Sequence, residues 1–244
     1  MIDIKNKKLI YDFDKSEFNF YEIFKNFFGA YSCNLEDIHE YFDKSILPSS
    51  LITVENDQNQ EIYKILYSID EGYSLKDKSI YKRGKFLSLY DKFINYIAQN
   101  IFNENLVYQN RPTLRSCFPN NKAVGDWHRD RDYNHPIEEI NIWVPITNAF
   151  GSNTIWIESE FDKEDYSPIN INNGQILIFD SSLKHGNVLN KESKTRLSFD
   201  FRVILKSKYK KPKSSKSYSQ GIDLKIGDYY SITSIYFLKL SFKF

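Results

Sequence analysis

The feature that most constrains the fold is the texture of the chain from Leu106 onward. Short alternating or apolar runs are separated there by Asn, Gly, Pro and Asp. This texture is typical of strands joined by tight turns. Strands are predicted near 113–118, 126–130, 139–147, 153–159, 175–180 and 195–204. Short strands at roughly even spacing predict an antiparallel sandwich or barrel, covered on one side by helices.

Residues 1 to about 105 have the different pattern of a mainly helical region. Apolar residues recur there at the three-to-four-residue spacing of a helix face, as in Phe20, Phe24, Phe27 and Phe28. A second helix is predicted from Asn34, with Leu35, Ile38 and Phe42 on one face, and a third between about Lys78 and Asn103. His39 lies in the second helix and is predicted to be a packing or solvated histidine outside any site.

The charge balance and the cysteines exclude several classes of protein. Lys+Arg 33 against Asp+Glu 32 gives a net charge of +1, so no global basic field indicates a nucleic-acid partner. Cys33 and Cys117 are far apart and form no CxxC, so neither a disulfide framework nor a thiolate zinc site is predicted. The chain has no apolar run long enough for a signal peptide or a membrane span. We therefore expect a cytoplasmic protein without a membrane partner.

His128 and Asp130 are the first candidates for chemistry. They are separated by one residue, so on an extended strand both side chains project from the same face, as two ligands of one metal ion require. His-x-Asp alone is a weak signal. With Arg129 and Arg131 beside it, a surface salt bridge explains the same residues.

A third candidate ligand, His185, follows Asp130 after an intervening series of predicted strands. It comes shortly after the apolar run ILIF and directly before Gly186, where a closing sheet can bring it back to the first pair. Two histidines and one carboxylate on one face of an octahedron leave three positions open. That arrangement suits non-haem Fe(II) oxygenases, in which cosubstrate and O2 occupy the open positions.

Arg196 begins an alternation that also contains Ser198, Asp200 and Arg202 on one strand face. The other face is apolar, with Leu197, Phe199, Phe201 and Val203. On an outer strand the polar face would simply meet water. Arginine's fork fits a carboxylate with two hydrogen bonds, so Arg196 could instead hold the distal carboxylate of 2-oxoglutarate on the polar floor of a cavity.

These residues carry a family resemblance. The segments HRD, KHGN and TRLSFDFR resemble the Fe(II)/2-oxoglutarate-dependent dioxygenases of the phytanoyl-CoA-hydroxylase-like group. The segment DWHRDRDYNHPIEEINIWVPITNAFGSNTIWIES is similar to the StrG-like branch associated with streptomycin-type biosynthesis. The resemblance covers about residues 110–204. It implies a double-stranded β-helix, iron held by His128, Asp130 and His185, and 2-oxoglutarate held by Arg196.

The resemblance also implies further contacts and shows two departures. Relatives often have a serine near the cosubstrate where this chain has Asn187, and a polar or basic residue where it has Arg115. Asn141, on the polar face of strand 139–147, is a further candidate for the cosubstrate. The intact Asp130 separates the chain from halogenases, in which a small residue replaces the carboxylate. The Pro-Gly-Ser-His-like turn of many relatives is replaced by the sequence of residues 157–160.

Substrate contacts are predicted around the metal strand and along the polar strand faces. The candidates are Trp127, Arg129, Arg131, Tyr133, His135, Trp143 and Arg202. Two of them have alternative interpretations. Trp143 could be ordinary core, and Arg202 could pair with Asp200. His135, which precedes a proline, is favoured as a substrate contact over a fourth metal ligand.

The predicted fold is mainly β with a helical N-terminal region, namely a double-stranded β-helix (jelly-roll or cupin-like) core flanked by helices. The predicted division is a helical part over 1–105, a catalytic core over 106–205, a lysine-rich loop or lid over 206–220 and a segment over 221–244 that returns to the core. That loop is either a mobile linker or a lid over an anionic substrate.

The predicted function is oxidative decarboxylation of 2-oxoglutarate by Fe(II) and O2, coupled to hydroxylation or a related oxidation. The expected substrate is a small polar metabolite, such as a sugar, aminocyclitol or amino-acid-like compound, in specialised-metabolite or surface-sugar biosynthesis. The alternatives are a non-catalytic binding module on the same fold and an oxygenase acting on protein or nucleic acid. Only the lysine-rich tail favours nucleic acid, so no nucleic-acid partner is expected, and no oligomeric state is predicted.

Overall fold

The computed structural model describes residues 4–41, 84–123, 126–210, 216 and 222–235. Its largest element is a seven-stranded antiparallel sheet in the order β1-β7-β4-β9-β2-β10, with β3 also paired to β9. The strands of this sheet are β1 (Lys8–Asp12), β2 (Leu106–Gln109), β3 (Thr113–Cys117), β4 (Ile140–Pro145), β7 (Gln175–Asp180), β9 (Arg196–Leu205) and β10 (Tyr230–Ile232). A second sheet, in the order β6-β5-β8, is formed by β5 (Trp156–Ile157), β6 (Ser167–Pro168) and β8 (His185–Gly186).

Strand β9 is the centre of the large sheet. Its ten residues pair with β4 along one edge and with β3 and then β2 along the other. Trp143 of β4 and Thr113 of β3 are both paired with Asp200. Because neighbouring strands are in register, side chains of β3, β4 and β9 that point the same way form one continuous surface.

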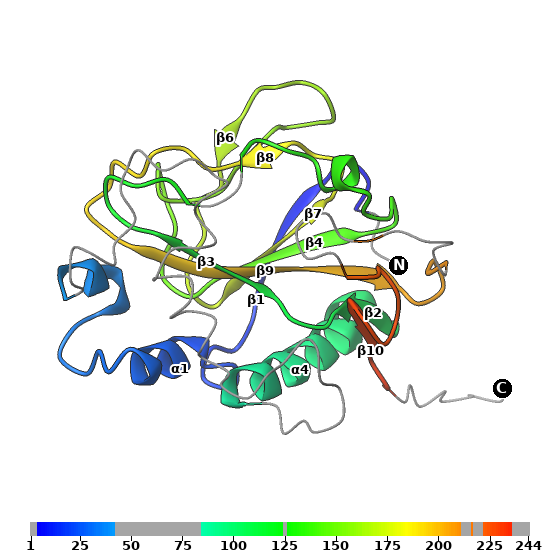
Figure 1. The fold of residues 1–244 in the computed structure, drawn as a ribbon, viewed down its shortest axis with the longest axis horizontal. Coiled ribbons are helices and arrows are strands. Elements are labelled where there is room, and N and C mark those ends of the chain that lie inside the picture. The colour runs from blue at the N-terminus through cyan, green and yellow to red at the C-terminus, as the bar shows by residue number, and fades with distance from the viewer. Residues whose placement is uncertain (1–3, 42–83, 124–125, 211–215, 217–221, 236–244) are drawn as a thin grey trace, which may run out of the picture.

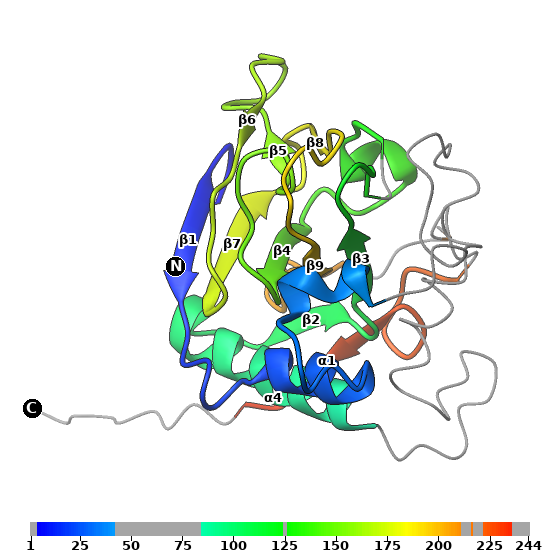
Figure 2. The same ribbon diagram turned by 90° about the vertical axis from the view of Figure 1, so that its left-hand side faces the viewer.

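Helices α1 (Phe20–Phe27) and α4 (Lys85–Ile97) cover one face of the large sheet (Figures 1 and 2). The 3-10 helix η1 (Leu35–Glu40) follows α1, and the π-helical turn η3 (Ala98–Phe102) continues α4. Asn19 caps α1 by accepting a hydrogen bond from the backbone N–H of Glu22. The core lies between these helices and the apolar face of β9, where Phe199 makes edge-to-face contacts with Phe20 and Phe86.

The second sheet lies over the opposite face of the large sheet (Figures 1 and 2). A smaller apolar cluster fills part of the space between the two sheets, and it includes Trp143, Ile157 and Phe179. The polar face of β9 looks into the same space, so both faces of this strand are buried. The predicted alternation of β9 is confirmed, and its polar side chains are buried except for Asp200, which is partly exposed.

Several predicted elements differ in the structure. The strand predicted over 126–130 is wrong, because His128 forms only an isolated bridge and η4 (Asp130–Tyr133) is a 3-10 helix. The strand predicted over 153–159 is shorter, since β5 has two residues. The mainly helical N-terminal region also contributes a strand, β1, which pairs with β7. The pattern had suggested only helices there, because five residues at a sheet edge carry little periodic signal.

The C-terminal segment returns to the body of the protein as β10, which pairs with β2. Much of the lysine-rich loop predicted over 206–220 lies outside the described residues, as do Phe42 and the start of the predicted third helix. The division of the chain into four parts stays a prediction. Among the described residues, no helix is both long enough and apolar enough to cross a membrane.

Candidate active site

The structure brings His128, Asp130 and His185 together, although His185 is far from the other two in sequence. The two histidines form a small antiparallel bridge, in which each backbone N–H donates to the other's carbonyl at 3.0 Å. The Nε2 atoms of His128 and His185 each lie 3.9 Å from an oxygen of the Asp130 carboxylate. One potential ligand atom from each residue lies within 4.8 Å of the other two.

Asp130 reaches this cluster even though it does not lie on a strand. Arg129, between the two ligands, is extended with φ −111° and ψ 135°. A single extended residue is enough to place its neighbours on the same side. The chain then turns into η4, whose first residue is the buried Asp130.

Hydrogen bonds to backbone carbonyls fix the orientation of both imidazoles. His128 Nδ1 lies 2.5 Å from the carbonyl oxygen of Asp126, and His185 Nδ1 lies 3.0 Å from that of Leu183. A carbonyl oxygen can only accept, so each Nδ1 carries the proton. Each Nε2 therefore presents a lone pair toward Asp130, which is the arrangement that metal-binding histidines use.

The protonation states also suit metal binding. Burial raises the pKa of the Asp130 carboxyl, but the Arg202 guanidinium, with smaller contributions from His185, His128 and His135, outweighs this effect and holds that pKa well below its usual value. Burial, with a smaller contribution from His128, lowers the pKa of His185 to about 4. At neutral pH the site thus offers an ionised carboxylate and a neutral imidazole, the forms that coordinate a metal ion.

The donor set fits a divalent transition metal. Two imidazole nitrogens and one carboxylate oxygen match the three protein ligands of non-haem iron sites. Metal–ligand bonds of about 2.0–2.2 Å place neighbouring ligands about 3 Å apart, so small inward movements of the imidazoles would complete the site. Asp130 is already oriented, because Arg202 Nη2 donates to Oδ1 at 2.6 Å and Asn141 Nδ2 donates to Oδ2.

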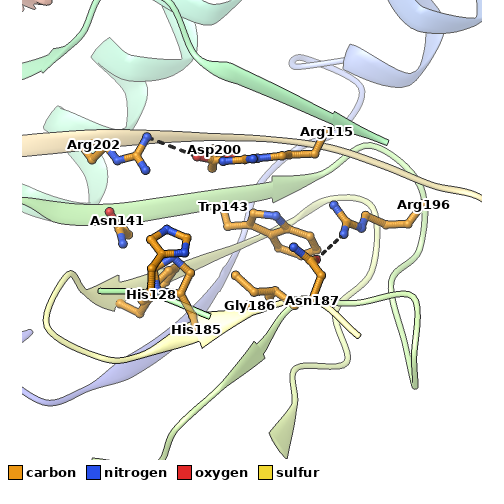
Figure 3. A pocket seen from close by; sticks show the side chains of 12 residues that line it. Arg115, His128, Asn141, Trp143, His185, Gly186, Asn187, Arg196, Asp200 and Arg202 are labelled. Carbon is orange, nitrogen blue, oxygen red and sulfur yellow. Dashed lines mark hydrogen bonds and ion pairs between the residues drawn. The ribbon is translucent and has the colours of Figure 1, made fainter. Parts of the chain in front are cut away.

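A cavity extends from this cluster between the two sheets (Figure 3). In Figure 3, His128 and His185 lie at one end of the group, and Arg196 and Asn187 lie at the other. Trp143 of β4 lies between the two ends. The lining residues are Arg115, His128, Asn141, Trp143, Ile155, Phe179, His185, Gly186, Asn187, Arg196, Asp200 and Arg202.

Arg196 is a buried guanidinium whose position is set by three hydrogen bonds. Its Nε donates to the carbonyl of Asn153 at 2.9 Å, its Nη1 to Ser198 Oγ at 2.7 Å and its Nη2 to Asn187 Oδ1 at 2.7 Å. The guanidinium carbon also lies 5.5 Å from the ring centroid of Trp143. The partners in these three hydrogen bonds are neutral groups, and a buried guanidinium beside them suits an anionic group in the cavity.

A chain of alternating charges connects the cavity floor to Asp130. Arg115 Nε donates to Asp200 Oδ1 at 2.8 Å, and Arg202 Nη1 lies 3.4 Å from Asp200 Oδ2. Arg202 in turn binds Asp130. The alternative pairing of Arg202 with Asp200 is therefore present, together with a shorter contact to Asp130 that the sequence had not suggested.

The four residues predicted for 2-oxoglutarate, namely Arg196, Asn187, Arg115 and Asn141, all line the cavity. Trp143 and Arg202, predicted for substrate, line it as well. Trp143 also packs into the apolar cluster between the sheets, so this side chain is both a core residue and part of the cavity wall.

The other predicted substrate residues are not among the cavity-lining residues. Trp127 packs on Tyr166, with ring centroids 4.1 Å apart, and its ring atoms lie against Gly186. Arg129 points to Glu158 and Asp162, and its guanidinium lies over the ring of Phe161. The Arg129 side chain faces outward because, on an extended segment, a residue between two inward-facing ligands points to the opposite side.

Three further candidates lie around the metal cluster. Arg131 Nη2 lies 4.0 Å from Asp180 Oδ1. The Tyr133 ring contacts His128 edge-to-face, with centroids 5.5 Å apart. His135 Nδ1 lies 2.9 Å from Glu139 Oε2, so its described contacts are those of a packing residue and not of a fourth metal ligand.

Two residues that the structure places near the proposed ligands were not predicted from the sequence. Gln109 Oε1 accepts a hydrogen bond from Arg202 at 3.3 Å. Glu158 is fully buried beside the segment that carries His185. No local pattern distinguishes a buried glutamate from an exposed one, and only the pairing of distant strands reveals Glu158.

A comparison with curated proteins found a similar sequence whose name includes a biosynthetic pathway. No family model matches the chain. Over 123 residues the chain is 42% identical to the streptomycin biosynthesis protein StrG of Streptomyces griseus. This region is 50% of the chain and 58% of StrG, so the chain matches little more than half the length of that relative.

Solved structures with partial similarity include three proteins with low sequence identity. CytC3 with Fe(II) and alpha-ketoglutarate is 16% identical at a TM-score of 0.40, over 72% of this chain and 78% of CytC3. AviO1 of Streptomyces viridochromogenes Tue57 is 16% identical at 0.41, over 67% and 90%. The alpha-ketoglutarate-dependent carbocyclase SnoK is 11% identical at 0.39, over 50% and 59%. All three TM-scores are below 0.5.

Proposed function

We propose that this protein is an Fe(II)/2-oxoglutarate-dependent oxygenase. The observation that carries the proposal is the cavity with His128 and His185 at one end and the buried Arg196 at the other. Asp130 completes the cluster with the two histidines. A dicarboxylate such as 2-oxoglutarate needs a metal for its oxo-acid end and a cation for its distal carboxylate. The cavity offers residues for both.

The protein's own contribution is to hold and orient the reactants. His128, Asp130 and His185 would hold the iron, and Arg202 and Asn141 keep the carboxylate in place. Bound iron would supply the oxidation chemistry, with 2-oxoglutarate and O2 converted to succinate and CO2 as the substrate is oxidised. Arg196 would bind the distal carboxylate of 2-oxoglutarate with two hydrogen bonds.

The remaining cavity residues would complete the cosubstrate site. Asn187 lies within hydrogen-bond distance of Arg196, and Arg115 and Asn141 present polar groups on the same surface. Trp143 would form an apolar wall that limits water near the metal. Placement, and not covalent chemistry by the protein, is the proposed role of all these side chains.

We infer that the substrate is a small polar metabolite. Beside Ile155, Phe179 and Gly186, the described cavity is lined by arginines, asparagines, histidines, an aspartate and a tryptophan. These polar groups suit a hydroxylated or amino-bearing molecule better than a fatty acyl chain. StrG is named for streptomycin biosynthesis, and the similarity to it supports a role in specialised-metabolite or surface-sugar biosynthesis. A sugar, an aminocyclitol or an amino-acid-like compound is the proposed class.

The two alternatives have less support. A non-catalytic binding module would have no use for a histidine–carboxylate cluster and a separate buried arginine in one cavity. An oxygenase acting on protein or nucleic acid would need a broad recognition surface, and the lysine-rich tail is the sequence feature that favours one. We further propose that the two facing sheets form a double-stranded β-helix and that the protein works in the cytoplasm.

Succinate production from 2-oxoglutarate tests the proposal. The purified protein is supplied with Fe(II), ascorbate, O2 and 2-oxoglutarate, and succinate is measured with panels of sugars, aminocyclitols, amino acids and acyl-CoAs. Stimulation by a member of the polar panels is expected, together with oxidation of that compound in a one-to-one ratio. The variant His128→Ala should give only background succinate.

Two results would contradict different parts of the proposal. Stimulation by acyl-CoAs alone would refute the substrate class and leave the reaction type intact. Succinate production that never exceeds that of His128→Ala, with or without any compound, would refute the oxygenase function.

A further inference from the structure

Glu158 is a fully buried carboxylate that does not line the cavity. It follows β5 directly and lies in the segment 157–160, which stands where the family resemblance implies a Pro-Gly-Ser-His-like turn. A buried carboxylate is costly unless its oxygens are paired, so its partners show what it is used for.

The first partner of Glu158 is the backbone of Lys184, the residue directly before His185. The Lys184 N–H donates to Glu158 Oε1 at 2.6 Å, and the Glu158 N–H donates to the carbonyl of Lys184 at 3.0 Å. Next to this pair, Ile157 is the β-partner of His185. Glu158 therefore fixes the backbone at the point where it enters the second histidine.

The second partner is Arg129, the residue between His128 and Asp130. Its Nη2 lies 3.3 Å from Glu158 Oε1 and 3.5 Å from Oε2. The side chain of Arg129 is 15% exposed and that of Glu158 is 0% exposed, so this ion pair is largely shielded from water. One carboxylate thus contacts both of the chain segments that carry the proposed ligands.

We propose that Glu158 is a positioning residue for the metal site, which joins the His128–Asp130 segment to the His185 segment through Arg129 and the Lys184 backbone. This inference rests on the proposed function, since it assumes that the three residues bind a metal ion. Glu158 does not contact the ligand side chains. It sets the relative position of the two segments on which they are carried.

The surroundings of Arg129 separate this role from a general surface charge effect. Arg129 Nη2 also lies 3.0 Å from Asp162 Oδ1, but the Asp162 side chain is 70% exposed. The Asp162 contact is the shorter one, but it is exposed to solvent, and exposed ion pairs contribute little to stability. Glu158 makes the longer contact in the interior, where it also holds the Lys184 N–H. Of these two carboxylates, Glu158 is the one whose described contacts join Arg129 to the His185 segment, so the two should differ in their effect on metal binding.

Titration of metal-free protein with Co(II), followed by visible absorption, tests the proposal without any turnover. Glu158→Gln keeps the size of the side chain and an acceptor for the Lys184 N–H, but it removes the negative charge opposite Arg129. Residues that support metal ligands from outside the coordination sphere change affinity by about tenfold to hundredfold. We expect the dissociation constant for Co(II) to rise by about tenfold or more, with an altered visible spectrum.

The matched controls are Asp162→Asn, which removes the exposed partner of the same arginine, and Glu160→Gln, which lies on the same loop and pairs only with Lys163 among its described ion pairs. Both should bind Co(II) within about twofold of the wild-type protein. Thermal unfolding of each metal-free variant is measured alongside. A purely structural Glu158 would lower the melting temperature and leave the affinity and spectrum of the folded protein unchanged.

Wild-type Co(II) affinity and an unchanged spectrum in folded Glu158→Gln would overturn the inference. If that variant does not fold, the double variant with Arg129→Gln, which removes both charges, is used, and wild-type affinity in it would be equally contradictory. A wild-type protein that binds no Co(II) would refute the proposed function itself. Tight binding by the wild type with an unaffected Glu158 variant would refute only the positioning role.

Discussion

Arg196 shows how a single residue can be specified by both its chemistry and its surroundings. Its guanidinium is held by Asn153, Ser198 and Asn187 and lies over Trp143. These contacts use its N–H groups in fixed directions, which a lysine ammonium cannot reproduce. The arginine is therefore oriented before any ligand enters the cavity.

Replacing Arg196 should separate cosubstrate binding from metal binding. Arg196→Met removes one charge-assisted pair with the distal carboxylate, a loss of about 1.5–3 kcal/mol, so 2-oxoglutarate should bind roughly tenfold to hundredfold more weakly. Co(II) affinity should change little. Isothermal titration of each ligand measures both, and Arg131→Met, an arginine beside Asp180, is the control. Equal losses of metal and 2-oxoglutarate affinity would count against the assigned role.

Gly186 is required by close packing beside the second histidine. A Cβ at this position would lie 2.9 Å from Trp127 Cδ2, closer than real Cβ contacts allow, and 3.2 Å from Trp127 Cα, closer than most real Cβ contacts. Trp127 directly precedes His128, so relief of the clash must shift the segment that carries the first ligand. Gly186 thus acts on the geometry of the site without any functional group.

Gly186→Ala is accordingly expected to weaken Co(II) binding by about tenfold, the scale seen when support of metal ligands is disturbed. Tryptophan fluorescence should report the displacement of Trp127. Adding Trp127→Leu to the same variant removes the ring atoms and should recover part of the affinity. Unchanged affinity in the single variant would show that the segment tolerates the shift.

The face on which each β9 side chain lies could be predicted, because side chains alternate strictly along a strand. The same argument places Arg129 opposite its neighbours, yet proximity in sequence had suggested it as a substrate contact. Its real partners, Glu158 and Asp162, lie far along the chain. Contacts of this kind depend on tertiary pairing that a single sequence does not display.

At the scale of elements, η1 is fastened to the start of β9. The Thr195 N–H donates to the carbonyl of Glu36 at 2.7 Å, and Thr195 Oγ1 lies 2.8 Å from His39 Nδ1. Lys194 and Asp37 add an ion pair with Nζ 2.5 Å from Oδ1. The packing role predicted for His39 is confirmed, and its contact lies one residue before Arg196.

Thr195→Val should loosen this junction while preserving side-chain shape. It leaves His39 Nδ1 without its hydroxyl partner, so we expect a loss of about 1 kcal/mol in the free energy of unfolding. Urea unfolding measures the change. In a double-mutant cycle, Thr195→Val should cost much less in a His39→Leu background. Additive losses would mean that the hydroxyl stabilises the protein through another contact.

Elements were predicted best where the periodic signal is long. The ten residues of β9 and the thirteen of α4 were recognised, whereas the strand predicted over 126–130 is absent and η4 begins at its last residue, Asp130. Asp130 reaches the site through one extended residue followed by a 3-10 turn, and two residues cannot reveal a period. The predicted ligand set depended only on that short extended step, so it survived the wrong element.

At the scale of the whole molecule, the helices and the large sheet share an aromatic core. The ring of Phe199 lies 4.8 Å from that of Phe20 and 5.6 Å from that of Phe86, measured between centroids. Tyr90 of α4 contacts both Phe199 and Phe201 edge-to-face. The polar face of the same strand forms the cavity floor, so this core supports the site directly.

Phe199→Ala should therefore be among the most damaging core substitutions. Removing a fully buried phenylalanine ring costs about 3–5 kcal/mol, through lost transfer free energy and the cavity left behind. Chemical denaturation should show this loss, whereas Phe150→Ala, at a position 39% exposed, should change stability by less than about 1 kcal/mol. Similar losses at the two positions would contradict the described core.

The sequence predicted a β protein with helices on one side. It did not predict how the strands pair or how they separate into two sheets. Alternating runs indicated a β protein covered by helices on one side, as Figures 1 and 2 show. Strand order, the pairing of β1 with β7 and the separation into two sheets depend on contacts across the whole chain. Those contacts bring Glu158 to the ligand segments and leave Arg196 buried at the far end of the cavity.

The most direct test of the central claim is anaerobic titration of the protein with Fe(II) and 2-oxoglutarate, followed by visible absorption. Chelation of iron by the oxo-acid end should produce a charge-transfer band that requires both components. We expect this band in the wild-type protein and its loss in His128→Ala. No band in the wild-type protein, or an undiminished band in His128→Ala, would contradict it.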